Sequence, residues 1–96
     1  MLFDSKRSES DIMHEILTYA KDGVRKTRLM HKANMSHNQL NRYLQLLQEY
    51  EMIQEKQVGD EGKLYVITEK GTDLLAALQE IHVLFHEERL IWSRVP

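Results

Sequence analysis

The sequence predicts a mostly helical α+β fold, in which three helices precede a two-stranded β-hairpin and a long helix follows it. Apolar residues recur at helical spacing in three segments before residue 50. The pattern then changes to two short runs with β-branched and aromatic residues, 52–58 and 63–67, which flank a loop with two glycines. A further helical pattern without proline continues to about residue 94.

The first two helices have recognisable boundary residues. Ser8 or Ser10 can cap a helix over residues 9–22, and Gly23 supplies a stop at its end. Thr27 is expected to cap a short second helix that carries several basic side chains.

A third helix is expected from His37 to about Tyr50, after a turn at residues 34–36. Ser36 and Gln39 form the S-x-x-Q pattern of a capping box at its start. Its buried face should consist of four residues at helical spacing: Leu40, Tyr43, Leu44 and Leu47.

This chain order is that of a winged helix-turn-helix. A short turn between two helices, followed by a hairpin that forms the wing, defines the plan. Thr68 is the expected cap of the last helix, which should begin at Glu69 or Thr72. We expect an N-terminal tail over residues 1–8, the winged helix-turn-helix domain over 9–71 and a separate C-terminal helix over 72–96.

Composition is that of an ordinary globular domain. The chain has 96 residues, of which 42% are hydrophobic and 29% charged. It has no cysteine, which excludes a disulfide, a thiol nucleophile and a cysteine zinc site. The first residues are too charged for a signal peptide, and no apolar run approaches the roughly 18 residues of a membrane span. We expect a soluble, cytoplasmic protein that does not enter a membrane.

Motifs of enzymes and cofactor sites are missing from the sequence. There is no glycine-rich phosphate loop and no H-E-x-x-H pattern. His82 and His86 have the spacing at which two imidazoles can share a metal, but no third ligand is evident. We therefore expect no catalytic residue, no metal and no cofactor.

Charge is distributed unevenly along the chain. The net charge is −2, yet residues 21–45 carry six basic side chains against one acidic side chain. Residues 46–96 carry five basic and ten acidic side chains. Because phosphate binding depends on the local field of one face, the basic block predicts a nucleic-acid surface inside an acidic protein.

Three segments resemble small archaeal winged-helix proteins. Residues 25–36, RKTRLMHKANMS, are similar to a family pattern K-T-R-I-M-x-K-A-N-L-S, and residues 40–44 to L-x-x-Y-L. Residues 65–71, YVITEKG, are similar to the Y-x-I-T-x-K-G that joins the wing to the last helix. The resemblance covers about residues 9–75. It implies a winged-helix fold, double-stranded DNA as ligand and dimerisation through a long C-terminal helix.

The third helix is the expected reader of the major groove. With its apolar face inward, its outward side chains can hydrogen-bond to base edges: His37, Asn38, Asn41, Arg42 and Gln45. A second set is placed to contact phosphates from the second helix and from helix N-termini: Arg25, Lys26, Thr27, Arg28, Lys32 and Ser36. For both sets an ordinary solvated surface remains the alternative.

The wing has mixed charge. Its tip carries Asp60 and Glu61, which repel a phosphate backbone, while Lys56 and Lys63 flank the tip and are the expected DNA contacts of the wing.

The last helix carries more apolar residues than one small domain can cover. We expect a dimer interface, an antiparallel coiled coil by family resemblance, made of Leu74, Leu78, Ile81, Leu84, Phe85, Ile91 and Trp92. A helix folded back on its own domain is the alternative.

The sequence thus favours a double-stranded DNA-binding transcriptional regulator that acts as a homodimer in the cytoplasm, at the nucleoid. Two alternatives remain open. One is a sequence-indifferent chromatin protein, and the other is a winged-helix module that binds proteins.

Overall fold

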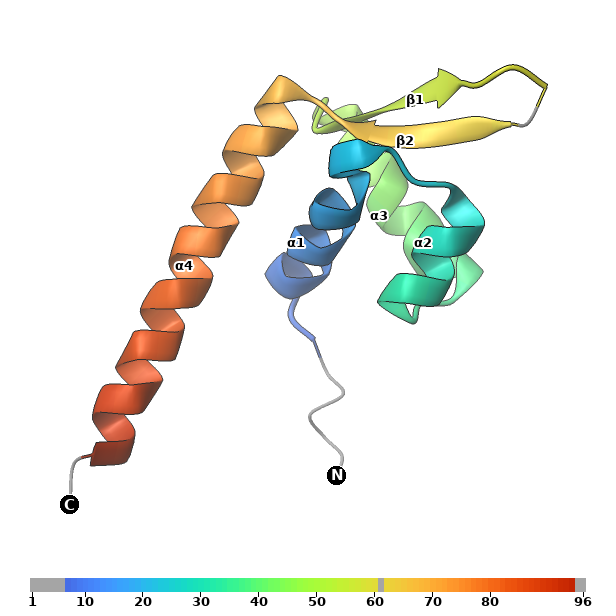
Figure 1. Ribbon diagram of the computed structural model, residues 1–96. Coiled ribbons are helices and arrows are strands. Elements are labelled where there is room, and N and C mark those ends of the chain that lie inside the picture. Colours follow the sequence, from blue (N-terminus) through green and yellow to red (C-terminus); the bar gives the residue numbers. More distant parts are fainter. Residues whose placement is uncertain (1–6, 61, 95–96) are drawn as a thin grey trace.

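A computed structural model describes residues 7–60 and 62–94, and from residue 85 onward it describes the helical backbone alone. The elements follow in the expected order (Figure 1). They are α1 (Glu9–Tyr19), a 3-10 turn η2 (Ala20–Asp22), α2 (Lys26–Ala33), α3 (His37–Glu49), β1 (Ile53–Gln57), β2 (Lys63–Ile67) and α4 (Glu69–Arg94). The predicted winged helix-turn-helix plan with a long final helix is confirmed.

The start of α1 is a complete capping box. The Ser8 hydroxyl accepts a hydrogen bond from the Asp11 backbone N–H at 3.1 Å, and the Ser8 N–H donates to the Asp11 carboxylate at 3.2 Å. Hydrogen bonding from the Ser8 side chain, followed by that from the Ser8 backbone, favours the ionised carboxylate and lowers the pKa of Asp11. α1 ends at Tyr19, three residues earlier than expected, and continues as the 3-10 turn η2, after which Gly23 has φ of +85°.

The start of α2 differs from the prediction. The N-cap is Arg25 and the helix begins at Lys26, so Thr27 lies inside the first turn. The cause is a long-range pairing: Val24 exchanges two backbone hydrogen bonds with Tyr65, at 3.0 and 2.8 Å. Val24 thereby adds a third short segment to the hairpin. The chain is extended through Arg25 and turns helical directly afterwards.

The ends of α2 and α3 share one geometry. After α2, Asn34 is left-handed with φ of 52°, and the Met35 N–H donates to the Met30 carbonyl at 3.1 Å. After α3, Glu51 is left-handed with φ of 60°, and the Met52 N–H donates to the Leu47 carbonyl at 2.8 Å. Both are Schellman motifs that satisfy the last helical carbonyls.

The third helix begins as predicted. The Ser36 hydroxyl accepts from the Gln39 backbone N–H at 3.2 Å, which makes Ser36 the N-cap of α3. Only two residues separate the end of α2 from this cap, so the geometry at Asn34 determines the direction of α3.

The wing is a regular antiparallel hairpin. Its register pairs Ile53 with Ile67 at the base and Gln57 with Lys63 near the tip. The Val58 N–H donates to the Gly62 carbonyl at 2.9 Å, and Gly62 has φ of +106°, which requires a residue without a Cβ.

Thr68 joins the wing to α4 and caps the helix as expected. Its hydroxyl accepts from the Gly71 backbone N–H at 2.9 Å and donates to the Glu51 carbonyl at 2.6 Å. Gly71 is buried against the chain that leaves α3, where a Cβ would lie 2.0 Å from the Met52 carbonyl oxygen. Glycine is required here by contact and not by its dihedral angles.

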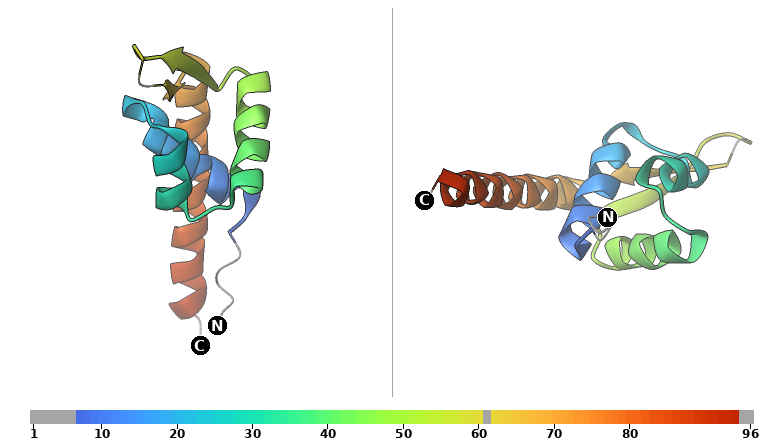
Figure 2. Two further views of the ribbon diagram at one scale, coloured as in Figure 1. Left: turned by 90° about the vertical axis from the view of Figure 1, so that its right-hand side faces the viewer. Right: turned by 90° about the horizontal axis from the view of Figure 1, so that it is seen from below.

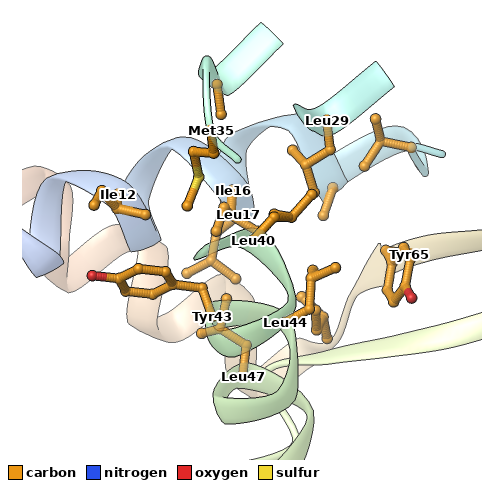
Figure 3. Close-up of a cluster of buried hydrophobic side chains, with 14 of the residues drawn as sticks. Ile12, Ile16, Leu17, Leu29, Met35, Leu40, Tyr43, Leu44, Leu47 and Tyr65 are labelled. Atoms are coloured by element: carbon orange, nitrogen blue, oxygen red, sulfur yellow. The ribbon is translucent and has the colours of Figure 1, made fainter. Parts of the chain in front are cut away.

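The core lies between α1, α2, α3, the hairpin and the first turns of α4 (Figure 3). The predicted inward face of α3 is confirmed, because all four of its residues are buried. Burying one Leu or Ile side chain contributes about 1.5–3 kcal/mol to stability. The fully buried side chains of Ile16, Leu17, Leu29, Leu40, Leu47 and Ile53 are therefore the main source of the fold's stability.

The last helix extends well beyond this core (Figure 1). The protein measures 60 × 31 × 20 Å and has a radius of gyration of 15.4 Å. A compact chain of this length would have a radius of gyration of about 12.5 Å. The difference reflects α4, whose C-terminal half projects away from the domain (Figure 2). In the part of the chain that the structure describes, no helix is long and apolar enough to cross a membrane.

Candidate nucleic-acid interface

The outward face of α3 presents the side chains that were predicted from its period. His37, Asn38, Arg42 and Gln45 are exposed, and Asn41 is half-buried. The four buried residues on the opposite side orient this face, because residues three and four apart share one side of a helix. The structure therefore brings all five predicted side chains to one surface of α3.

Two of these side chains already make contacts. The Asn41 Nδ2 and His37 Nδ1 atoms lie 3.1 Å apart, one helical turn from each other. The Arg42 guanidinium carbon lies 5.7 Å from the centre of the Tyr43 ring, a cation–π contact worth about 0.5–1 kcal/mol at an exposed site. Contact with a base would require Arg42 to give up this modest interaction.

A groove of about 270 Å³ runs along the same side of α3. It is lined by Glu9, Arg42, Tyr43, Gln45, Leu46 and Glu49. Glu49 places an acid at the C-terminal end of the outward face, which the sequence reasoning overlooked because it stopped at Gln45. The part of the face suited to an anionic ligand is consequently its N-terminal part, from His37 to Gln45.

The basic side chains of α2 are spread along the helix that precedes the turn before α3. Arg28 and Lys32 are exposed and lie one turn apart on α2, while Lys26 is half-buried. Arg25 and Thr27 are exposed at the N-terminus of the helix, whose first backbone N–H groups point out of the helix. His31, also exposed, is a further polar side chain of α2 that the sequence analysis did not include.

The base of the wing is attached to α3 through Glu55. Its carboxylate accepts from Gln48 of α3 at 3.2 Å and from the Tyr65 hydroxyl at 3.4 Å, and it pairs with Lys63 at 3.3 Å. The Gln48 bond is the main reason that the pKa of Glu55 is lowered, with Lys63 next. Burial, followed by the Glu55 charge, raises the pKa of Tyr65.

The two predicted wing lysines therefore differ. Lys63 is exposed but has Glu55 as an ion-pair partner on β1, which offsets part of its charge. Lys56 is exposed and follows Glu55 in the strand, so its side chain is directed to the opposite face of the hairpin. Asp60 is exposed at the tip, whereas Glu61 lies outside the described residues.

The predicted dimer residues of α4 fall into two groups. Leu78, only 9% exposed, belongs to the core of its own protomer together with Leu75, and Leu74 packs against that core. Leu78 therefore offers little surface to a partner, and its place in a dimer interface stays a prediction. The sequence could not separate core residues from interface residues in α4, because apolar residues recur along the helix both where it packs on the domain and where it projects from it.

Further along α4 the apolar side chains are open to solvent. Ile81 is 47% exposed, Leu84 is 60% exposed and Val83, which the sequence analysis did not select, is 52% exposed. The side chains of Phe85, Ile91 and Trp92 lie outside the described residues, as does that of His86.

His82 contacts α1. Its ring stacks on that of His14 with centroids 6.1 Å apart and an interplanar angle of 15°. Among the described side chains, no group of three metal-ligating residues gathers around this pair or elsewhere.

Three helices, of which α2 and α3 form a helix-turn-helix, and a hairpin wing define the class of winged helix-turn-helix domains. The chain belongs to the winged helix-turn-helix family, whose model matches residues 6–85. Comparison with curated protein sequences gives no match.

Two solved structures illustrate the likeness. Sso10a-2, a DNA-binding protein from the archaeon Sulfolobus solfataricus, is 24% identical with a TM-score of 0.73, over 94% of this chain and 98% of its own. MepR, a transcription regulator of the Staphylococcus aureus multidrug efflux pump MepA, is 17% identical with a TM-score of 0.71. That match covers 90% of this chain but 65% of MepR. The expected resemblance to small archaeal winged-helix proteins is confirmed.

Proposed function

We propose that this protein is a double-stranded DNA-binding transcriptional regulator that acts as a homodimer, with α3 reading the major groove. The observation that carries the proposal is the juxtaposition of the polar outward face of α3 with the exposed cations of α2. Both helices and the wing lie on the side of the molecule away from α4 (Figure 2).

The roles of the side chains follow from their chemistry. Asn38, Asn41 and Gln45 can each form paired hydrogen bonds with adenine, Arg42 can form them with guanine, and His37 adds a further polar group. Phosphate contacts are assigned to the cations of α2, to the N-termini of α2 and α3 and to the wing: Arg25, Lys26, Thr27, Arg28, Lys32, Ser36, Lys56 and Lys63.

The relatives support this assignment. Sso10a-2 is described as a DNA-binding protein and MepR as a transcription regulator, and a MepR variant has been solved bound to an oligodeoxyribonucleotide. The same fold therefore binds DNA in proteins that are similar in structure to this chain. A nucleoid location in the cytoplasm follows from the proposed ligand.

The homodimer is proposed through the part of α4 that projects from the domain. Ile81 and Leu84 are three positions apart, on one side of this segment, and are about half exposed or more. Apolar rows of this kind on a projecting helix are typical of helix–helix interfaces. A second copy of α4 would cover them, and Phe85, Ile91 and Trp92 would continue the same interface.

The test is fluorescence anisotropy with labelled duplexes over a series of salt concentrations. One duplex carries the upstream region of the protein's own gene, and the other carries the same bases in scrambled order. We expect the upstream duplex to bind at least about 10³-fold more tightly near physiological salt. The double variant Asn41→Ala/Arg42→Ala should remove most of this preference, whereas Lys70→Ala, at an exposed position of α4, should leave it unchanged.

Other results would select the alternatives. Equal affinity for both duplexes with a steep salt dependence would identify a sequence-indifferent chromatin protein. Failure to bind either duplex at low salt would contradict DNA binding and favour a protein-interaction module, for which the acidic wing tip would be the first candidate surface.

A further inference from the structure

Arg7 connects the beginning of the fold to the helix-turn-helix. One guanidinium nitrogen, Nη1, pairs with the Glu15 carboxylate of α1. The other, Nη2, donates to the Ala33 carbonyl at 2.6 Å and lies 3.5 Å from the Asn34 carbonyl. The side chain is 31% exposed, as is that of Glu15, so the group is partly shielded from solvent.

These contacts lie at the C-terminal end of α2, where backbone carbonyls lack hydrogen-bond donors within the helix. The last carbonyls of a helix have no partner within the helix, and the helix dipole concentrates negative charge there. The Schellman bonds of Asn34 and Met35 are to the carbonyls of His31 and Met30, which leaves the Ala33 carbonyl for Arg7. Arg7 thus complements the turn's own hydrogen bonds.

The turn determines where α3 begins. Asn34 is left-handed, Met35 is buried and Ser36 is already the N-cap of α3. A shift of the Ala33 and Asn34 carbonyls would therefore move the residues proposed to enter the major groove. The planar fork of an arginine can hold a carboxylate and a carbonyl at fixed angles, which a lysine cannot do.

We propose that Arg7 is a positioning residue for DNA recognition, which holds the helix-turn-helix turn against α1 with Glu15 as its anchor. The inference rests on the proposed DNA-binding function. It assigns a role to a residue that the sequence places in an N-terminal tail, ahead of the domain.

The competing explanation is that Arg7 contacts a phosphate directly. The two explanations predict opposite effects of neutralising Glu15. If Glu15 holds Arg7 in place, Glu15→Gln loosens the turn and weakens DNA binding. If Arg7 serves as a free cation, Glu15→Gln removes a competing anion and strengthens binding. Glu80→Gln, at an exposed acid of α4 outside the proposed DNA-binding surface, measures the effect of the lost charge alone.

The experiment measures duplex affinity over a salt series for the full chain and for Arg7→Gln, Glu15→Gln, the double variant and Glu80→Gln. We expect Arg7→Gln and Glu15→Gln each to weaken binding by about three- to tenfold, with the double variant little weaker than either. The salt slope should stay unchanged, because no phosphate contact is lost. Arg7→Lys should restore only part of the affinity.

Amide hydrogen exchange in the free protein supplies a second readout. We expect faster exchange at Asn34 and Met35 in both single variants, while the amides of α4 remain as in the wild type. Tighter DNA binding by Glu15→Gln, or a salt slope that falls by about one in Arg7→Gln, would overturn the positioning role in favour of a phosphate contact. If the wild-type protein binds no duplex, the proposed function itself fails and the positioning role fails with it.

Discussion

Gly71 shows how a single residue can be required by its neighbours. It lies in the first turn of α4, where the chain that leaves α3 passes directly over it. A Cβ at this position would lie 2.0 Å from the Met52 carbonyl oxygen and 2.8 Å from the Ile67 side chain. The contact is with backbone, which cannot move aside as the end of a side chain can.

Gly71→Ala should therefore destabilise the fold, although alanine is the better helix former by about 1 kcal/mol. We expect the free energy of unfolding to fall by about 1–3 kcal/mol, as in other overpacked sites. Denaturant titration followed by circular dichroism measures the change. Lys70→Ala, at the exposed neighbouring position, should alter it by less than about 0.5 kcal/mol. An increase in stability with Gly71→Ala would mean that the close approach to Met52 is absent in solution.

Asp11 makes the stability depend on pH in the acid range. Hydrogen bonds from Ser8 lower the pKa of Asp11 in the folded protein below the ordinary value of about 3.9. The carboxylate's contribution is therefore fully present above that value and is lost as the pH falls through it toward the folded pKa.

We expect Asp11→Asn to melt at a lower temperature than the wild type at pH 7, and the difference between them to shrink below about pH 4. Thermal denaturation between pH 7 and pH 2.5 provides the measurement. A difference that stays constant over this range would show that the Asp11 charge does not strengthen the capping box.

The residue contacts that sequence predicts are the local ones. Ser8, Ser36 and Thr68 cap helices as their positions indicated, because a cap depends on residues within one turn. Arg7 and Glu55 were not foreseen as structural residues. Their partners lie up to 27 and 10 positions away, and no periodic pattern relates such distant residues.

At the scale of elements, the ends of α2 and α3 were harder to predict than their interiors. The left-handed residue that follows a helix is commonly glycine, but after α2 and α3 it is Asn34 and Glu51. Asparagine tolerates this conformation relatively well, whereas a glutamate there is under strain of about 1–2 kcal/mol.

Glu51→Gly should therefore stabilise the protein. Relief of the left-handed strain exceeds the entropy that glycine adds to the unfolded chain, and we expect a net gain of about 0.5–1 kcal/mol. The matched control is Glu49→Gly, at the last right-handed residue of α3, which should cost about 1 kcal/mol. Equal losses in both variants would contradict the left-handed geometry at Glu51. Chemical denaturation resolves differences of this size.

The start of α2 was misplaced for a related reason. A threonine followed by a helical pattern is a valid cap signal, but the pairing of Val24 with Tyr65 sets the start of α2 one residue before Thr27. The tertiary contact overrode the local preference.

At the scale of the whole molecule, the division of α4 between core and surface could be learned only from the fold. Its apolar stripe continues with one spacing, yet Leu75 and Leu78 pack on the domain while Ile81 and Leu84 do not. Spacing alone does not reveal this boundary, because His82 still stacks on His14 of α1 while the neighbouring Ile81 and Leu84 are exposed. Leu74 and Leu78 of the predicted interface thus stabilise the monomer, and Ile81 and Leu84 are left for the proposed second copy.

The oligomeric state can be tested at these exposed positions. We expect the wild type to be a dimer at micromolar concentration by size-exclusion chromatography with light scattering, and Ile81→Asp/Leu84→Asp to be a folded monomer. The monomer keeps its core because neither side chain is buried within its own chain, and Gln79→Asp, at an exposed polar position of α4, should leave the dimer intact.

The monomeric variant should also bind the upstream duplex more weakly. A dimer contacts two half-sites of the duplex at once, whereas a single protomer contacts only one. A wild type that is monomeric, or a double variant that remains dimeric, would remove α4 as the interface. A monomeric variant with undiminished affinity would instead show that one winged helix is sufficient for recognition.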